Sequence, residues 1–279
     1  MPLKGFYINL DRSTDRRQQV EAELEKVSAL GNYHRFPAID GHDSSVRPDL
    51  KNRAEVGCFA SHLEVIRNSN APGQWLHILE DDVVISTLAD VAISALINGQ
   101  MFDQYDIIFT NIMPSMSAIL GKQFSNTFDS CVTTTASGEV TSLNSISAIS
   151  LSGADFGLTT SYLINPRAVQ RVISLLGIWL NTNPFVPIDI VYSQLARAGQ
   201  LSIACSVPFF TIPRSGDTST IRAGVEPWKM AHLVLETALF ADRNIAQLRS
   251  QLREVPQAPT GSVTRDLIAE AYRCVLNSA

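Results

Sequence analysis

The run from Trp75 to Glu80 constrains the fold most, because an apolar stretch ends there in three consecutive acids, Glu80, Asp81 and Asp82. A short apolar run after a turn signal, here Pro72-Gly73, is typical of a fully buried strand in a parallel sheet. Ligands of open α/β sheets bind beyond the carboxyl ends of such strands. The run therefore predicts a central strand with a ligand site at its end, although a solvated strand end that starts a loop would explain the same residues.

The acidic cluster also predicts a bound cation. Three adjacent carboxylates repel one another unless a positive charge lies between them. A site made only of carboxylate oxygens suits Mg²⁺ or Mn²⁺ better than Zn²⁺. Along an extended chain, Glu80 and Asp82 point to one side and Asp81 to the other.

Composition places the chain of 279 residues among globular proteins, with 45% hydrophobic and 18% charged residues, enough to bury a substantial core. The net charge of -5 gives no overall basic surface, so we expect no nucleic-acid partner. The four cysteines lack the paired spacing of a zinc knuckle or a disulfide framework. Because we find neither an apolar signal core nor a run of about 18 apolar residues, we expect a cytoplasmic protein.

Strands and helices are expected to alternate along the first part of the chain. Strand patterns occur at 6–10, 33–39, 75–80 and 105–109, and helical patterns at 14–30, 55–67 and 87–97. This order predicts an α/β fold with a mostly parallel central sheet flanked by helices on both faces. Further strands are expected at 159–164 and 201–205, and further helices after 165, from 188 to 199, near 227–253 and at 264–277. By contrast, 112–153 is rich in Ser, Thr and Asn, with only short strands such as 131–135, and we expect it to be a mobile flap beside the site.

Arginines gather after the first predicted strand. In a doubly wound sheet this loop faces the ligand crevice, so Arg12, Arg16 and Arg17 could bind phosphates. They could equally pair with Glu21 and Glu25 along the helix that follows.

Four further positions carry chemistry. Asp40 follows the second strand and is a candidate for a base or ribose contact. Cys58 and His62 share a helical face, but nothing nearby supplies two more metal ligands, so we favour a hydrogen-bonded, half-buried His62. Asp189 falls in a first helical turn, where the dipole favours its ionised form, either as a proton acceptor or merely as a dipole partner. The loop at 214–222 offers hydroxyls and two arginines suited to phosphate oxygens.

A series of sequence blocks resembles glycosyltransferase family 25. They are YINLDR at 7–12 with DRR at 15–17, PAIDG at 37–41, EVGCFASHL at 55–63, ILEDDV at 78–83, SYLI at 161–164, PID at 187–189 and STI at 219–221. The order and spacing of the blocks carry the resemblance, while 112–153 matches no block. The family holds lipopolysaccharide galactosyltransferases of Gram-negative bacteria and collagen galactosyltransferases.

This resemblance implies a GT-A type fold, a UDP-sugar donor, typically UDP-galactose, a divalent metal and inversion at the anomeric carbon. It implies a catalytic domain at 1–225, with a nucleotide-binding half at about 1–110 and an acceptor half at about 111–225, followed by C-terminal helices at 226–279 that pack on it or mediate association. The acceptor would be a saccharide or glycolipid, reached by peripheral contact at the cytoplasmic face of the inner membrane.

The resemblance and the chemistry together assign roles to residues. The donor-binding residues would be Asn9, Leu10, Asp11, Arg12, Arg16, Asp40, Glu80, Asp81, Ser219 and Arg222. Asp82 and Glu80 are assigned to Mn²⁺ or Mg²⁺, which stabilises the charge that grows on the departing UDP. Asp189 is assigned as the general base, with Asp155 in reserve, and His232 is a weak candidate for a further metal ligand.

Three other functions remain open at this point. A transferase of the same fold could use UDP-glucose or a UDP-N-acetylhexosamine, since the pocket that reads the sugar is not visible in the sequence. A catalytically idle nucleotide-binding subunit could have the same fold. A metal-dependent phosphohydrolase could use the same acids, but it would need a nucleophile or more ligands, and the five histidines are scattered.

Overall fold

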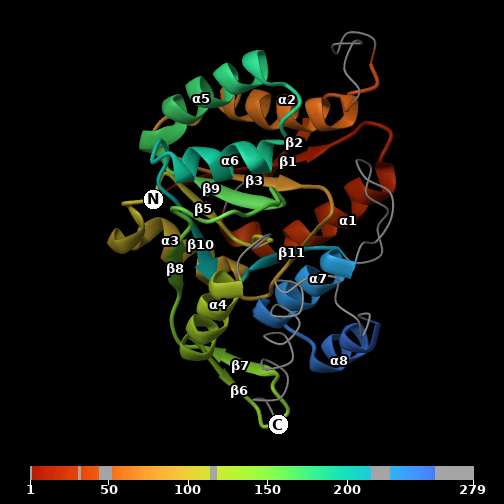
Figure 1. Ribbon diagram of the computed structural model, residues 1–279, viewed down its shortest axis with the longest axis vertical. Helices are drawn as coiled ribbons and strands as arrows, with labels where there is room; N and C mark the ends of the chain where they lie inside the picture. The colour runs from red at the N-terminus through yellow and green to blue at the C-terminus, as the bar shows by residue number, and fades with distance from the viewer. Residues whose placement is uncertain (1, 31–32, 44–51, 114–117, 215–226, 255–279) are drawn as a thin grey trace.

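The computed structural model describes residues 2–30, 33–43, 52–113, 118–214 and 227–254 (Figure 1). The strands are β1 Leu3–Asn9, β2 Tyr33–Pro37, β3 Trp75–Glu80, β4 Val83–Ile85, β5 Ile107–Phe109, β6 Val132–Thr134, β7 Val140–Leu143, β8 Ser147–Ser150, β9 Ser161–Ile164, β10 Ile203–Val207 and β11 Thr211–Pro213. The α-helices are α1 Thr14–Leu24, α2 Arg53–Arg67, α3 Ala89–Asn98, α4 Ala118–Cys131, α5 Val169–Thr182, α6 Ile188–Arg197, α7 Pro227–Leu239 and α8 Ile245–Glu254. Short 3₁₀ helices lie at Glu25–Leu30, Gln100–Phe102 and Pro166–Ala168.

The central sheet has seven strands in the order β2-β1-β3-β9-β5-β10-β8. Strand β1 pairs in parallel with both β2 and β3, and β10 pairs in parallel with β5. Strand β9 is antiparallel to both β3 and β5, so those two strands point the same way. Strand β8 closes the edge antiparallel to β10. The prediction of an α/β fold with a mostly parallel sheet is confirmed.

Helices cover both faces of this sheet, as the alternation of elements predicted. On β3, Leu76 and Ile78 belong to a core that includes residues of α2, α5 and α6, which lie together at the top of Figure 1. The alternate residues Trp75 and Leu79 belong to a second core, which includes residues of α1 and α3. Because successive strand residues face opposite sides, β3 contributes to both cores and lies at the centre of the fold.

Within its described residues, the segment at 112–153 is largely regular, with one helix and three short strands, which its polar composition did not predict; the mobile flap stays a prediction. Helix α4 buries Leu120, Phe124 and Phe128, which recur every four residues and form one apolar stripe against the main core. The chain then forms the β6–β7 hairpin, where β6 confirms the short strand expected at 131–135, and β8 joins the central sheet. Residues 114–117 lie outside the described part of the chain.

Two helices follow the sheet near the C-terminal end of the described chain. The stretch expected as helical near 227–253 is divided into α7 and α8, and Leu235 and Leu239 of α7 join the main core. Glu236 is buried on α7, its Oε1 has no hydrogen-bond partner among the described residues, and burial raises its pKa to about 8. Within the described ranges, no helix is long and apolar enough to cross a membrane. The helix expected at 264–277 lies outside them.

Helix α2 approaches the loop after β2 very closely, and Gly57 is the reason. A Cβ atom at Gly57 would lie 2.5 Å from the backbone nitrogen of Gly41 and 2.6 Å from the carbonyl oxygen of Ile39. The Ile39 N–H also donates to Ser61 Oγ at 2.8 Å. These contacts fix the start of α2 beside the edge of the sheet at which β1, β2 and β3 end.

Candidate active site at the carboxyl edge of the sheet

The three consecutive acids lie at the end of β3 but do not continue its alternation. Glu80 is the last strand residue and has the same parity as Ile78, so it faces α2. Asp81 and Asp82 form the turn that leads into β4. The sequence analysis assumed that the chain stays extended from Glu80 to Asp82, which would point these two side chains to the same side. That assumption was wrong, because the chain turns after Glu80.

Asn9 and Arg16 connect the end of β1 to the two aspartates. Asn9 is buried at the end of β1, and its Nδ2 donates to Asp81 Oδ2 at 2.7 Å and to the Ser13 carbonyl at 3.0 Å. The Arg16 guanidinium lies 2.9 Å from Asp81 Oδ1 and 2.8 Å from Asp82 Oδ2. Arg16 therefore lies at the acidic edge of the sheet, and phosphate binding by this arginine stays a prediction.

Asp82 retains uncompensated negative charge despite this arginine. Its Oδ1 is buried and has no hydrogen-bond partner within the described ranges. Burial and the nearby Glu80 carboxylate raise the pKa of Asp82 to about 7, although the Arg16 charge opposes them. A buried oxygen of this kind is a natural position for a cation or for a water molecule bound to one.

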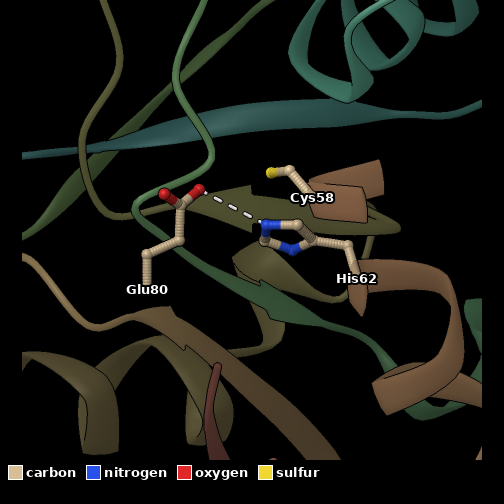
Figure 2. A group of neighbouring side chains, drawn as sticks. All are labelled: Cys58, His62 and Glu80. Atoms are coloured by element: carbon tan, nitrogen blue, oxygen red, sulfur yellow. Dashed lines mark ion pairs between the residues drawn. The ribbon is translucent and has the colours of Figure 1, made fainter. Parts of the chain in front are cut away.

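Glu80 has a different set of partners from Asp81 and Asp82. Thr159 Oγ1 donates to Glu80 Oε1 at 2.6 Å, and His62 Nε2 lies 3.3 Å from the same oxygen (Figure 2). Burial alone would raise the pKa of Glu80, but the nearby His62 and the Thr159 hydroxyl outweigh it and hold the pKa below its ordinary value. Both of these contacts are made by Oε1.

His62 is part of a buried polar chain that begins at this carboxylate. Its Nδ1 lies 2.9 Å from the Tyr162 hydroxyl, which in turn accepts from the Tyr192 hydroxyl at 3.5 Å. The predicted hydrogen bond of His62 is confirmed, but the prediction of half burial was wrong, because α2 packs against the sheet and leaves the ring 0% exposed.

Asp189 lies in the first turn of α6, as predicted, and is connected to the same edge. Its Oδ2 accepts from the Leu158 N–H at 3.2 Å, and its Oδ1 accepts from the Ile190 N–H at 2.8 Å. Leu158 immediately precedes Thr159, so consecutive residues hold Asp189 and Glu80. Leu158 adopts a φ of 76°, a left-handed conformation that is strained for a residue other than glycine and is often found at functional sites.

Cys58 lies on α2 one turn before His62. Burial raises the pKa of its thiol, and the charges of Glu80, Asp189 and Asp82 raise it further. Carboxylates of β3, of the turn after it and of both α2 and α6 therefore lie within electrostatic range of this thiol.

The remaining predicted donor-binding residues lie at the rim or outside the described chain. Asp40 pairs with Arg12, and the exposed Asp11 pairs with Arg35, whose guanidinium also bonds to Asn9. Leu10 follows β1 and is half-buried. Ser219 and Arg222 belong to residues 215–226, which the structure does not describe.

The structure also places three further residues that the sequence analysis named as candidates. Arg17 pairs with Glu21 along α1, which confirms the local alternative for that arginine. The reserve base Asp155 is exposed and pairs with Arg197. His232 is buried on α7, and burial lowers its pKa to about 4.

Sequence reasoning missed Arg35, Thr159 and Tyr162. Arg35 lies opposite Tyr7 in the β1–β2 register, and a charged residue inside a short strand was the available signal for it. Thr159 and Tyr162 carry no comparable signal, because their contacts with Glu80 and His62 depend on where β9 enters the sheet.

Comparison with known proteins identifies a family and several solved structures of low similarity. The model of the family described as Glycosyltransferase family 25 (LPS biosynthesis protein) matches residues 3–192. Among solved structures, the galactosyltransferase LgtC in complex with donor and acceptor sugar analogs has 9% identity and a TM-score of 0.41, covering 92% of this chain and 98% of that one. A glycosyltransferase involved in glycosylation of the major capsid of PBCV-1 has 8% identity and a TM-score of 0.40, covering 74% of this chain and 81% of that one. No curated protein matches the sequence.

Proposed function

Because the chain belongs to glycosyltransferase family 25, we propose that it transfers a hexose from a UDP-sugar, with inversion, to a saccharide or glycolipid acceptor of lipopolysaccharide or another surface glycan. The α/β fold with acids at the carboxyl edge of a mostly parallel sheet is the GT-A type arrangement expected for this family. The proposed donor is UDP-galactose, and UDP-glucose or a UDP-N-acetylhexosamine is the rival. In this proposal the reaction takes place at the cytoplasmic face of the inner membrane.

The convergence of Asn9, Arg16, Asp81 and Asp82 is the observation that carries this proposal. A departing UDP gains negative charge as the glycosidic bond breaks, and preorganised cations lower the energy of that state. Arg16 supplies one positive charge at the edge of the sheet, where both aspartates hold its guanidinium in place. The other proposed donor contacts, Asp40 and Asp11, are engaged in exposed ion pairs, which are weak and easily exchanged for a ligand.

The residues at this edge also fit a divalent cation. The buried Oδ1 of Asp82 has no partner among the described residues, and the available donors are carboxylate oxygens, which suit Mn²⁺ or Mg²⁺. We propose that Asp82 holds the ion and that Glu80 assists through Oε2, the oxygen on the side away from the contacts with Thr159 and His62. When bound, the ion would supply additional charge stabilisation to the diphosphate.

Asp189 is the proposed general base. An inverting displacement needs a base on the face opposite the leaving group, to take the proton of the acceptor hydroxyl as it attacks. Two features support Asp189: it accepts hydrogen bonds from two backbone N–H groups, which keep its carboxylate oriented, and the residue that holds it, Leu158, is strained. Its link to Glu80 through consecutive residues places the proposed base beside the proposed donor site.

A donor screen tests the proposed function. Purified protein is incubated with UDP-galactose, UDP-glucose, UDP-N-acetylglucosamine, a GDP-sugar and a CMP-sugar, with Mn²⁺ or with a chelator, and the released nucleotide is measured. We expect release of UDP that depends on the sugar and requires the divalent ion. Binding of UDP without turnover of any UDP-sugar would identify an idle subunit instead. Release of UMP and hexose 1-phosphate without any acceptor would identify a phosphohydrolase.

A further inference from the structure

Cys58, His62 and Glu80 form a second group of metal-ligand atoms beside the acidic edge. One ligand atom from each residue lies within 4.8 Å of the other two. Figure 2 shows that Cys58 and His62 extend from one face of α2, and that Glu80 extends toward them from the end of β3. Asp82 is not a member of this group, so the group overlaps the proposed cation position only at Glu80.

The buried Nε2 of His62 points into this group without a hydrogen bond. The ring is 0% exposed, and Nε2 has no hydrogen-bond partner within the described ranges, although Glu80 Oε1 lies 3.3 Å away. The other ring nitrogen is already engaged with the Tyr162 hydroxyl at 2.9 Å. When a metal ion replaces the Nε2 proton and Nδ1–H donates to that hydroxyl, the Nε2 lone pair is directed between Cys58 and Glu80. The contact of Nε2 with the Glu80 carboxylate is longer than an ideal hydrogen bond, and the position of Nε2 between Cys58 and Glu80 suits a metal ligand.

The distances agree with a tetrahedral zinc site. Ligand bonds of roughly 2.0–2.1 Å to nitrogen and oxygen place these two atoms about 3.3 Å apart, which equals the observed distance of 3.3 Å between His62 Nε2 and Glu80 Oε1. A thiolate bound at roughly 2.3 Å would lie about 3.6 Å from the nitrogen. Cys58 Sγ lies within 4.8 Å of both atoms, so the three ligand atoms are gathered on the scale that one ion requires.

The outer partners expected for such a site are also present. Metal-binding histidines almost always use their second nitrogen in a hydrogen bond that orients the ring, as His62 does with Tyr162. Ligating carboxylates are likewise hydrogen-bonded, as Glu80 is by Thr159 at 2.6 Å. These two hydrogen bonds orient the His62 ring and the Glu80 carboxylate.

We propose that Cys58 Sγ, His62 Nε2 and Glu80 Oε1 bind Zn²⁺, with a water molecule in the fourth position. The combination of thiolate, imidazole and one carboxylate favours Zn²⁺ over the harder Mn²⁺ and Mg²⁺, which prefer oxygen ligands. Binding replaces the thiol proton of Cys58, which is released to solvent. One consequence rests on the proposed function. Glu80 belongs both to this zinc site and to the proposed cation site at Asp82, so Zn²⁺ bound here competes for the Glu80 carboxylate and inhibits sugar transfer.

Cobalt substitution tests the binding itself, without any nucleotide or sugar. The full-length protein, stripped with a chelator, is titrated with Co²⁺, and a thiolate-to-cobalt charge-transfer band with intense tetrahedral d–d bands is expected. Cys58→Ser should abolish the charge-transfer band, whereas Cys205→Ser, which removes a buried thiol from β10, should retain it. Cys58→Ala serves as a second variant, and melting curves establish that each variant is folded. No band in the wild type, or an unchanged band in the folded Cys58 variants, overturns the proposal.

Zinc affinity and inhibition are then measured separately. Competition with a zinc indicator should show that Cys58→Ser weakens binding by more than the roughly 10- to 100-fold that loss of an outer partner costs. Zn²⁺ should inhibit UDP-sugar turnover by the wild type at concentrations that leave Cys58→Ser active. Tight binding without inhibition would overturn the shared role of Glu80 alone. A protein that turns over no UDP-sugar leaves the cobalt result intact, so failures of the two proposals are distinguishable.

Discussion

Replacing Asp189 with Asn removes the proposed base while preserving the size of the side chain. The carboxylate accepts one N–H on each oxygen, from Leu158 and from Ile190, and an amide can replace only one of these acceptors. A hydrogen bond contributes about 0.5–1.5 kcal/mol, and a negative charge in a first helical turn contributes about 0.3–1 kcal/mol. We therefore expect the free energy of unfolding of Asp189→Asn to fall by about 1–2 kcal/mol. The protein remains folded with a loss of this size.

The effect of this substitution on turnover should be far larger. A positioned base typically contributes roughly 10²- to 10⁴-fold to the rate, so single-turnover cleavage of the UDP-sugar should slow by that factor. The affinities for UDP and Mn²⁺ should stay near those of the wild type, because the substitution leaves Asp82 and Arg16 unchanged and preserves the size of the side chain at position 189.

Rapid-quench measurement of donor hydrolysis, in which water takes the place of the acceptor, provides the assay. Asp155→Asn is the matched control, because the Asp155–Arg197 pair is about half exposed, with side-chain exposures of 49% and 54%. Loss of such a pair costs about 0–1 kcal/mol and should leave turnover unchanged. Normal turnover by a folded Asp189→Asn protein would refute the assignment, and a rate loss in Asp155→Asn would transfer the role of base to that residue.

Two further predictions concern stability. Because the folded-state pKa of Glu236, about 8, lies above its unfolded value, the stability it contributes is complete at low pH and is lost as pH rises through about 8. The free energy of unfolding of the wild type, measured by urea titration, should fall by roughly 3 kcal/mol between about pH 6 and 9. Glu236→Gln should not show this fall. If the wild type and the variant show the same pH dependence, the buried Glu236 is not its cause. Gly57→Ala should lower the free energy of unfolding by about 1–2 kcal/mol, because overlap with the backbone outweighs the gain in helix propensity. Gly177→Ala, where the new Cβ meets only the flexible end of Arg67 at 3.0 Å, should raise it by about 0.5–1 kcal/mol, and equal effects at the two glycines would contradict the role of close approach.

Local patterns in the sequence were sufficient for the central elements. The apolar run before Glu80 predicted β3 correctly, because a strand that is buried on both faces consists of consecutive apolar residues and is recognisable from them. The Asn165-Pro166 pair predicted a helix start, and Asn165 indeed accepts a hydrogen bond from the Arg167 N–H at 3.2 Å. Asp189 was placed correctly in its helical turn for a similar reason, since the signals for helix starts are local.

Features that depend on tertiary contacts were not predictable in the same way. The apolar pattern of β9 would be the same whether the strand ran parallel or antiparallel to its neighbours. The sequence therefore did not predict that β9 lies antiparallel between β3 and β5. Helix α4 was missed because its stripe of Leu120, Phe124 and Phe128 is embedded in a polar composition typical of loops. The contact between His62 and Glu80 likewise exists only because α2 packs on the face of β3 that carries Glu80.

Calorimetric titration of UDP into the protein, with and without Mn²⁺, tests most directly whether the acids at the end of β3 form a nucleotide-sugar site. The wild type should bind UDP more tightly with Mn²⁺ than with a chelator, and Asp82→Asn should lose this difference while keeping its metal-free affinity. Asp103→Asn is the matched control, since Asp103 precedes β5 and lies at the opposite edge of the sheet, and it should behave as the wild type. If Asp82→Asn retains the full effect of Mn²⁺ on UDP binding, or if the wild type does not bind UDP under either condition, the site is not the one described.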